Sequence, residues 1–387
     1  MRFAIFTSTR AEYGLLTPLI RAIAKAPDME ADLLVSGTHL LKKYGETVQY
    51  IENDGNVIAY RIPIMEEDFS GTEKEVTDSI ARCMKQCSGI FEKEKYAGLI
   101  VLGDRYELMG VCVAAMMFRI PIIHIHGGEV TEGAIDEKIR HAITKMASVH
   151  FPSVEEYAQR ILQMGENPDF VYPVGALGID SIVSLPLMEK EELYKELEIE
   201  TDRKVAAVTY HPVTSLSREC AIEEIRSVME ALKEAELYSV ITMPNSDAGG
   251  EEIFRVILEY TEKMPDRFVL KKSLGQLRYL SLLKNADVMV GNSSSGILES
   301  ASFAIPTVNI GDRQKGRMAP MNVIHCECTK HAVLDAIMQG MSNQFKKQME
   351  HCVNPYGDGN TASKMIEHLR AIDWNDTGLI QKHFFDR

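Results

Sequence analysis

The length, composition and charge of the chain limit the kind of protein it can be. The chain has 387 residues, 45% hydrophobic and 25% charged, which is ordinary for a globular enzyme and large enough to predict two domains. Its formal charge of −14 argues against a nucleic-acid partner, because a duplex requires a basic surface. No apolar run reaches the roughly 18 residues of a membrane span, and the N-terminus lacks the apolar region of a secretory signal. We therefore expect a cytoplasmic protein without a membrane partner.

The first half of the chain alternates short apolar strands with helical patterns. Helices are expected at about 13–25 and 135–146, and strands at residues 3–8, 31–37, 57–64, 97–104, 120–128, 149–153 and 169–175. The strands are almost continuously hydrophobic, which is typical of a parallel sheet covered by helices on both faces. Residues 1–175 are therefore predicted to form a doubly wound α/β domain.

The same alternation restarts after a segment rich in Gly, Pro and charge near residues 176–200. Strands are expected at 204–212, 238–245, 267–272, 286–293 and 305–312. The predicted fold is α/β, with two Rossmann-like domains, 1–175 and 176–365, facing each other across a cleft. A C-terminal segment, 366–387, completes the chain, with helix candidates at 361–373 and 375–383 that could pack on either domain.

Ligands of such folds bind beyond the carboxyl ends of the strands. The first strand is followed by STRAEYG, and the chain contains no GxGxxG, which argues against a tightly held NAD and leaves no cofactor expected. Arg10 stands in this first loop, where its planar guanidinium suits a phosphate. The alternative is a surface arginine paired with Glu12.

The sequence GNSSSG at 291–296 indicates a second anion-binding loop. It ends a predicted strand and is expected to open a helix, whose backbone N–H groups and serine hydroxyls could bind phosphate. Helix capping alone is the alternative. Glu299 follows as a candidate acceptor for ribose hydroxyls, and Arg313 comes after the next strand. This half of the site is predicted to bind a nucleoside diphosphate.

Acidic side chains follow two strands of the first half. Asp104 ends one strand, Glu129 follows the next, and Asp136 begins a helix in which Arg140, four residues on, is a possible partner. The stretch is predicted to be acid/base machinery.

Two histidines in this stretch raise the alternative of a metal site. His124 and His126 would share one face of a strand, a spacing that metal sites also use. The neighbourhood also contains the cationic residues Arg105, Lys138 and Arg140, whose charges would repel a divalent cation. No metal is therefore expected.

A series of motifs carries a family resemblance across most of the chain. In order, they are STRAEYG, SGTHL, KKYG, LGDRYE, HIHGGEVTEGAIDEKIRHAITKM, YHPVT, PNSDAGG, GNSSSG, NIGDRQKGR and NPYGDGN. Together, from residue 4 to about 365, they resemble the hydrolysing branch of the UDP-N-acetylglucosamine 2-epimerases, whose bacterial members supply N-acetylmannosamine for sialic acid synthesis.

The resemblance implies a fold similar to the B-type glycosyltransferases, a UDP-sugar substrate and a homodimer or homotetramer. It also implies elimination of UDP to a glycal, followed by hydration, so that UDP-N-acetylglucosamine gives N-acetylmannosamine and UDP. The alternative substrate is UDP-2,4-diacetamido-2,4,6-trideoxyglucose of the legionaminic acid pathway, and GDP is a conceivable leaving nucleotide.

The resemblance also assigns residues. Acid/base or substrate-contacting positions fall on Asp104, Glu129, Asp136 and His211. Nucleotide contacts fall on Arg10, Arg105, Asn245, Asp247, Ser293, Ser294, Glu299 and Arg313, and the sugar side on His39 and Tyr44. His126 stands where several relatives have glutamate, so either His126 or Glu129 is expected to transfer a proton.

Three other functions stay open at this point. A B-type glycosyltransferase shares the fold but needs an acceptor and has no use for so many acids. A non-catalytic nucleotide-sugar sensor would not need the acidic stretch either. The non-hydrolysing epimerases usually open with arginine-proline-glutamate, where this chain has RAE.

Overall fold

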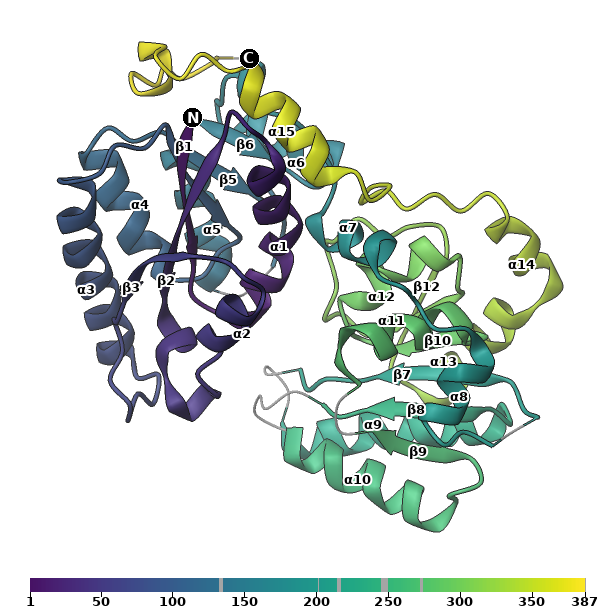
Figure 1. The fold of residues 1–387 in the computed structure, drawn as a ribbon. Coiled ribbons are helices and arrows are strands. Elements are labelled where there is room, and N and C mark those ends of the chain that lie inside the picture. The colour runs from purple at the N-terminus through teal and green to yellow at the C-terminus, as the bar shows by residue number, and fades with distance from the viewer. Residues whose placement is uncertain (132–134, 201, 214–216, 245–249, 272–273, 387) are drawn as a thin grey trace. The chain divides into compact units, whose positions relative to one another are not determined.

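The chain forms two compact units (Figure 1). The computed structural model describes residues 1–387 except 132–134, 201, 214–216, 245–249, 272–273 and 387. The first unit comprises Met1–Val183 and Tyr356–Arg387, and the second comprises Ser184–Pro355. These boundaries differ from the predicted ones at 175 and 365. Asp180 accounts for the difference, because its carboxylate accepts the N–H groups of Thr361 (2.9 Å) and Ala362 (2.7 Å) within the first unit.

The first unit is built on a parallel six-stranded sheet of order β3-β2-β1-β4-β5-β6. Its strands are β1 (Arg2–Thr7), β2 (Glu30–Ser36), β3 (Ile58–Ile62), β4 (Gly98–Leu102), β5 (Ile122–Ile125) and β6 (Val149–Phe151). Its helices are α1 (Arg10–Lys25), α2 (Val48–Asn53), α3 (Glu73–Phe91), α4 (Glu107–Met117), α5 (Ile135–Met146), α6 (Glu155–Gln163), α7 (Leu177–Ser184) and α15 (Thr361–Ala371). This is the predicted doubly wound α/β arrangement.

The second unit repeats the architecture with a parallel sheet of order β12-β11-β10-β7-β8-β9. Its strands are β7 (Val205–Thr209), β8 (Tyr238–Thr242), β9 (Phe268–Lys271), β10 (Val288–Gly291), β11 (Thr307–Ile310) and β12 (Val323–Cys326). Its helices are α8 (Lys190–Glu196), α9 (Arg218–Glu234), α10 (Gly250–Lys263), α11 (Gly275–Asn285), α12 (Ser295–Leu298), α13 (Lys330–Met341) and α14 (Asn343–Met349). The predicted fold class is confirmed.

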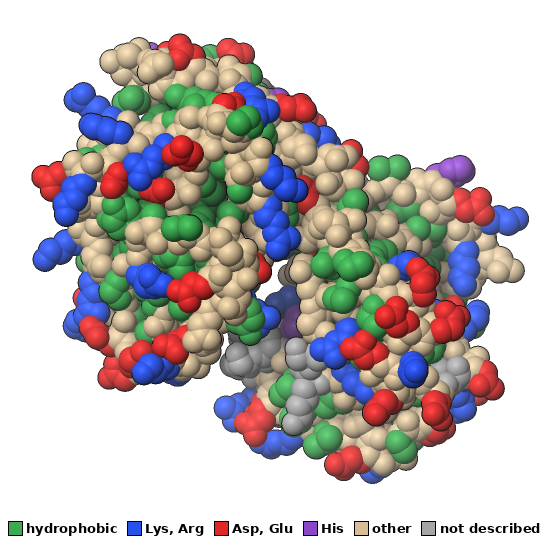
Figure 2. All heavy atoms as spheres, in the orientation of Figure 1, with side chains coloured by type: hydrophobic (Ala, Val, Ile, Leu, Met, Phe, Trp, Pro, Cys, Tyr) green, Lys and Arg blue, Asp and Glu red, His purple; other side chains and the backbone are tan. Residues whose placement is uncertain are grey.

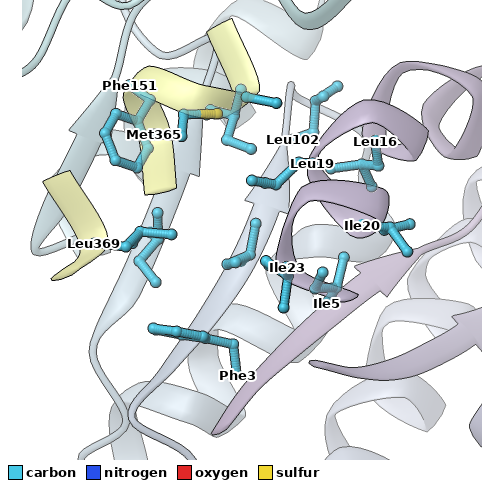
Figure 3. Packing of buried hydrophobic residues seen from close by; sticks show 14 of the residues in the cluster. Phe3, Ile5, Leu16, Leu19, Ile20, Ile23, Leu102, Phe151, Met365 and Leu369 are labelled. Carbon is cyan, nitrogen blue, oxygen red and sulfur yellow. The ribbon is translucent and has the colours of Figure 1, made fainter. Parts of the chain in front are cut away.

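Both faces of the first sheet are buried, as the continuous hydrophobic strands require. Phe3 and Ile5 of β1 belong to one apolar cluster, whereas Ala4 and Phe6 belong to the other. Helices α1 and α15 supply the first cluster, and Figure 3 shows side chains of both helices packed around Phe3 and Ile5. The question of where the C-terminal helix packs is therefore answered for α15, which lies against α1.

Two predicted elements are wrong. The expected strand at 169–175 is reduced to a 3-10 helix, Pro168–Phe170, and one isolated bridge between Val171 and His150, because Pro173 lacks an N–H for a strand ladder. The expected helix at 375–383 is reduced to a 3-10 helix, Thr377–Leu379.

Charged side chains of both signs are mixed over the face seen in Figure 2, together with hydrophobic ones. None of the helices in the described residues combines the length and the hydropathy that crossing a membrane requires.

Candidate active site

The acidic residues of the first unit meet because they follow neighbouring parallel strands. Leu102, the last residue of β4, is in register with Ile125, the last residue of β5. Asp104 therefore comes out beside the loop that begins at His126. Helix α5 starts ten residues after β5 ends and packs against α4, so its first turn joins the same edge of the sheet.

Arg140 of α5 is the centre of this cluster. Its side chain is only 3% exposed, and it donates to the Glu129 carbonyl (2.8 Å), Glu137 Oε2 (2.8 Å) and Thr131 Oγ1 (2.8 Å). It also forms an ion pair with Asp104. A buried guanidinium with this many partners fixes the relative position of both loops.

The structure corrects the expected pairing of Asp136 with Arg140, because Arg140 forms its ion pairs with Asp104 and Glu137. Asp136 is left half-buried in the first turn of α5. Desolvation raises its pKa, and the charge of Asp104 adds to this, while Arg105 and Arg140 oppose it. Two carboxyl groups in unlike surroundings are the arrangement that separates an acid from a base.

The two histidines have different surroundings. His124 is completely buried, with Nε2 2.8 Å from the Gly103 carbonyl and Nδ1 3.2 Å from Thr144 Oγ1. Burial lowers its pKa to about 3. His126 lies beyond the end of β5 with φ 64°, so the strand alternation that would have put both rings on one face stops before it. Within the described residues, no three metal-binding side chains converge.

His126 and Glu129 form a pair. His126 Nδ1 lies 3.1 Å from Glu129 Oε1, which also accepts a hydrogen bond from Ser153 Oγ (3.0 Å). The other ring nitrogen of His126, Nε2, is buried and has no hydrogen-bond partner among the described residues. A left-handed backbone at a non-glycine residue costs free energy and is often found at functional sites. Gly128 makes the same turn tight, since a Cβ there would lie 2.5 Å from the Tyr157 carbonyl oxygen.

The other predicted residues of the first unit lie beyond β1, β2 and β4. Arg10 begins α1 and is exposed, with its guanidinium 4.5 Å from the centre of the Tyr50 ring. The expected alternative, a pair with Glu12, does not form. Glu12 instead accepts the N–H of Thr9 (3.0 Å) in the capping box of α1, and also the N–H of Ser8 (2.9 Å). Arg105 donates to Glu107, at 2.8 and 3.1 Å.

His39 and Tyr44, the predicted sugar-side residues, differ in exposure. His39 is fully buried between Thr7 Oγ1 (3.1 Å) and Thr47 Oγ1 (2.9 Å), and burial lowers its pKa to about 4. Both ring nitrogens of His39 are engaged by these hydroxyls, so the side chain stabilises the loop after β2 and offers no nitrogen to a ligand. Tyr44 is 44% exposed and therefore accessible.

In the second unit, Asn292 joins the loops after β7 and β10. Its Oδ1 accepts the N–H of His211 (2.7 Å), its Nδ2 donates to the His211 carbonyl (2.8 Å), and it is fully buried. Its own carbonyl accepts from Arg313 (3.2 Å) and Gln314 (2.9 Å). His211 and Arg313, which were predicted from separate motifs, are thus brought to one place.

The serine loop is built differently from its prediction. Helix α12 has only four residues, and Ser294, its N-cap, makes no capping hydrogen bond. Ser293 Oγ accepts the N–H of Ser295 (3.3 Å). Ser295 Oγ accepts from Tyr279 (2.8 Å) and donates to Glu299 Oε2 (2.5 Å). Desolvation raises the pKa of Glu299, and the hydrogen bond from Ser295 opposes this rise.

Sequence reasoning did not predict the contacts that fix these loops within each unit. Asn292 and Arg140 are inside recognised motifs, but their partners come from other loops, so no local spacing reveals them. Tyr279 has no sequence signal. The predicted Asn245 and Asp247 lie outside the described residues.

Comparison with known proteins identifies the family of the chain. A family model described as UDP-N-acetylglucosamine 2-epimerase matches residues 21–370. The chain belongs to the UDP-N-acetylglucosamine 2-epimerase family. Family membership and the relatives below support the coarse assignment of a UDP-sugar 2-epimerase.

Relatives of this epimerase family resemble the chain over nearly its whole length. UDP-N,N'-diacetylbacillosamine 2-epimerase (hydrolyzing) of Legionella pneumophila is 34% identical, over 95% of this chain and 94% of that protein. GDP/UDP-N,N'-diacetylbacillosamine 2-epimerase (hydrolyzing) of Campylobacter jejuni is 36% identical, over 100% of this chain and 99% of that protein. Polysialic acid biosynthesis protein P7 of Escherichia coli is 35% identical, over 95% of this chain and 92% of that protein.

A solved structure of an epimerase from this family supports the fold. The UDP-GlcNAc 2-epimerase from Neisseria meningitidis bound to UDP-GlcNAc superposes with a TM-score of 0.81, covering 96% of this chain and all of that one at 18% identity. The family model and the relatives confirm the predicted similarity to the hydrolysing 2-epimerases.

Proposed function

We propose that the protein is a hydrolysing 2-epimerase that converts UDP-N-acetylglucosamine to N-acetylmannosamine and UDP. The observation that carries the proposal is the set of side chains fixed around Arg140, with Asp104, Asp136 and the His126–Glu129 pair beside one another at one sheet edge. Family membership supplies the substrate class, and the hydrolysing relatives support a reaction that consumes water.

The chemistry explains why such a set is needed. A base removes the C2 proton, the C–H electrons form the C1–C2 double bond, and the C1–O electrons leave with UDP. An acid then returns a proton to C2 from the opposite face, water adds its hydroxyl to C1, and the proton that the water loses restores the acid. Because the C2 proton of a hexosamine has no adjacent carbonyl to acidify it, the site must supply both a positioned base and an acid.

We assign the two proton transfers to the His126–Glu129 pair and to Asp136. Glu129 holds Nδ1 of His126, as a carboxylate orients the imidazole of a general base, and Nε2 is the atom left to exchange a proton with substrate. Asp136, with its raised pKa, is the second proton donor and acceptor. Asp104, ion-paired with Arg140, is assigned the charge that adds to the effect of burial in raising this pKa.

We assign UDP to the residues predicted for it. Arg10, Arg105, Ser293, Ser294 and Arg313 are proposed to bind the diphosphate, and Glu299 the ribose. Oε2 of Glu299 accepts from Ser295, while Oε1 has no hydrogen-bond partner among the described residues, so it is the atom assigned to a ribose hydroxyl.

The other predicted contacts complete the proposal. Tyr44, His211, Asn245 and Asp247 remain proposed substrate contacts. The cytoplasmic location and the homodimer or homotetramer stay predictions.

A second substrate is supported by the relatives. Two of those most similar to the chain are named for UDP-N,N'-diacetylbacillosamine, which differs from UDP-N-acetylglucosamine at C4 and C6. The reaction at C1 and C2 would be the same, and so would the residues proposed for it.

The test is to mix the purified protein with each nucleotide sugar in deuterium oxide and identify the products by NMR. The expected result is free UDP and a 2-epimeric sugar with deuterium at C2, for one of the two UDP-sugars. The corresponding GDP-sugar serves as a control for the nucleotide. A sugar that keeps its C2 hydrogen and configuration would instead indicate a simple hydrolase or a glycosyltransferase without its acceptor.

A further inference from the structure

A buried ion cluster in the first unit lies outside the proposed chemistry. Glu166, which is 1% exposed, accepts hydrogen bonds from Lys145 (2.6 Å) and lies 2.5 Å from Lys382 Nζ and 3.0 Å from His150 Nε2. Burial raises the pKa of Glu166, but the hydrogen bonds and charges of its three partners outweigh this and lower it to about 2. Buried ions are costly unless paired in good geometry, so such a cluster fixes its members in one arrangement.

Lys382 also caps α5. Its ammonium donates to the carbonyl oxygens of Lys145 (2.7 Å) and Ala147 (2.6 Å). The last carbonyls of a helix have no partner within the helix, and a positive charge there is favourable for the helix dipole. Lys382 therefore joins the C-terminal end of α5 to a carboxylate on a different element.

The residues around Lys382 hold it in place. Ser148 Oγ donates to the Leu379 carbonyl, and the Phe385 N–H donates to the Gly165 carbonyl (3.1 Å). The Phe384 ring lies 5.1 Å from the Lys145 ammonium. We call residues 379–385 the C-terminal strap. The strap fixes the segment after α6, at Gly165 and Glu166, to the end of α5.

The other end of α5 carries groups of the proposed reaction. Asp136 is in its first turn, and Arg140, one turn on, binds Asp104. The helix has twelve residues, so its two ends are about 18 Å apart and are joined by continuous helical hydrogen bonds. A shift at the strap end is thus transmitted to Asp136 and Arg140.

We infer that Lys382 is a positioning residue, which fixes the C-terminal end of α5 so that Asp136 and Arg140 are held against Asp104. The inference rests on the proposed function, because it assigns the strap to the reaction of those residues. A misplaced acid or base loses rate without losing nucleotide affinity. The expected signature is therefore a fall in kcat at unchanged UDP binding.

The test compares Lys382→Met, Lys382→Arg and a control, Lys74→Met, in which the lysine is 85% exposed on α3. Lys382→Met is expected to lower kcat about tenfold and to leave UDP affinity within about twofold in calorimetry. Hydrogen exchange of the α5 amides should accelerate, while that of α4 stays unchanged. Lys382→Arg should restore most of kcat, and Lys74→Met should match the wild type.

A second variant keeps the test decisive if Lys382→Met fails to fold. Phe384→Ala loosens the strap but leaves Glu166 with its ionic partners, and it should accelerate α5 exchange and lower kcat in the same direction. Unchanged α5 exchange and kcat in a folded variant would overturn the inference, as would a fall in kcat accompanied by an equal fall in UDP affinity. If the proposed function is wrong, the result differs, because the wild type itself turns over neither UDP-sugar.

Discussion

Replacing Gly291 by alanine is expected to disrupt the central strand pair of the second sheet. Gly291 ends β10 with φ 148°, and a Cβ there would lie 1.9 Å from the carbonyl oxygen of Thr209 on β7. Because this oxygen accepts the Asn292 N–H (3.2 Å), the overlap is relieved only by separating the two strands. The expected loss of stability is about 4 kcal/mol or more, the range reached when strain adds to a steric clash.

Gly311→Ala is the matched control. Gly311 follows β11 in the same unit with φ 69°, but no atom lies within 4 Å of its added Cβ. This substitution therefore costs only the left-handed backbone, about 1–2 kcal/mol. The difference between the two variants measures the contact with Thr209.

The assay is urea unfolding followed with two probes. The single tryptophan, Trp374, packs on Phe3 in the first unit, so its fluorescence follows that unit, and hydrogen exchange of β7 and β10 follows the second. With a urea m-value of about 2 kcal/mol per molar, Gly291→Ala should lower the midpoint of the second unit by about 2 M. The Trp374 transition should not move. Equal midpoints for Gly291→Ala and Gly311→Ala would refute the reasoning.

Two further predictions concern the candidate site, and a third concerns the pH dependence of the stability of the first unit. Asp136→Asn should lower turnover about 100-fold, as expected for loss of a general acid or base, with UDP affinity intact; steady-state kinetics showing full activity would contradict its role. Arg313→Ala should weaken UDP binding by about 1.5–3 kcal/mol, and unchanged calorimetry would remove it from the phosphate site. Burial lowers the pKa of His39 to about 4 and of His124 to about 3, whereas both are near 6.5 when unfolded. Their contribution to stability is therefore full above pH 6.5 and falls toward pH 4 by about 1.4 kcal/mol per pH unit for each histidine. His39→Gln should reduce that slope in urea unfolding followed by Trp374 fluorescence, and an unchanged slope would contradict the assignment.

The strands and helices that were predicted well are those with a strong local pattern. The range 135–146 agrees with α5, because its apolar residues recur at helical spacing. By contrast, β12 was not predicted, since its residues Val323–Cys326 are only partly buried or exposed and alternate weakly. The range 375–383 opens with Asn, Asp, Thr and Gly, which are poor helix formers, and tertiary contacts of the C-terminal strap determine its path.

The positions of the candidate site residues were more predictable than their contacts. The rule that ligands bind after parallel strands located Asp104, His126 and Arg313 from sequence alone. The partner of Arg140 was not predictable, because the choice between Asp136 on the same helix and Asp104 after β4 depends on how α5 lies on the sheet. The same holds for His39, whose burial depends on Thr7 and Thr47 from two different segments.

The division of the first unit between two distant stretches of chain has a consequence for biosynthesis. Ser184–Pro355 is one continuous stretch, so its sheet leaves the ribosome complete and can form during translation. The first unit must wait, because Met365 and Leu369 of α15 fill a core that begins with Phe3. Until those residues emerge, the nascent chain exposes an apolar face of its first sheet. Chaperones that bind such surfaces are expected to associate with the nascent chain from the emergence of the first sheet until the emergence of α15.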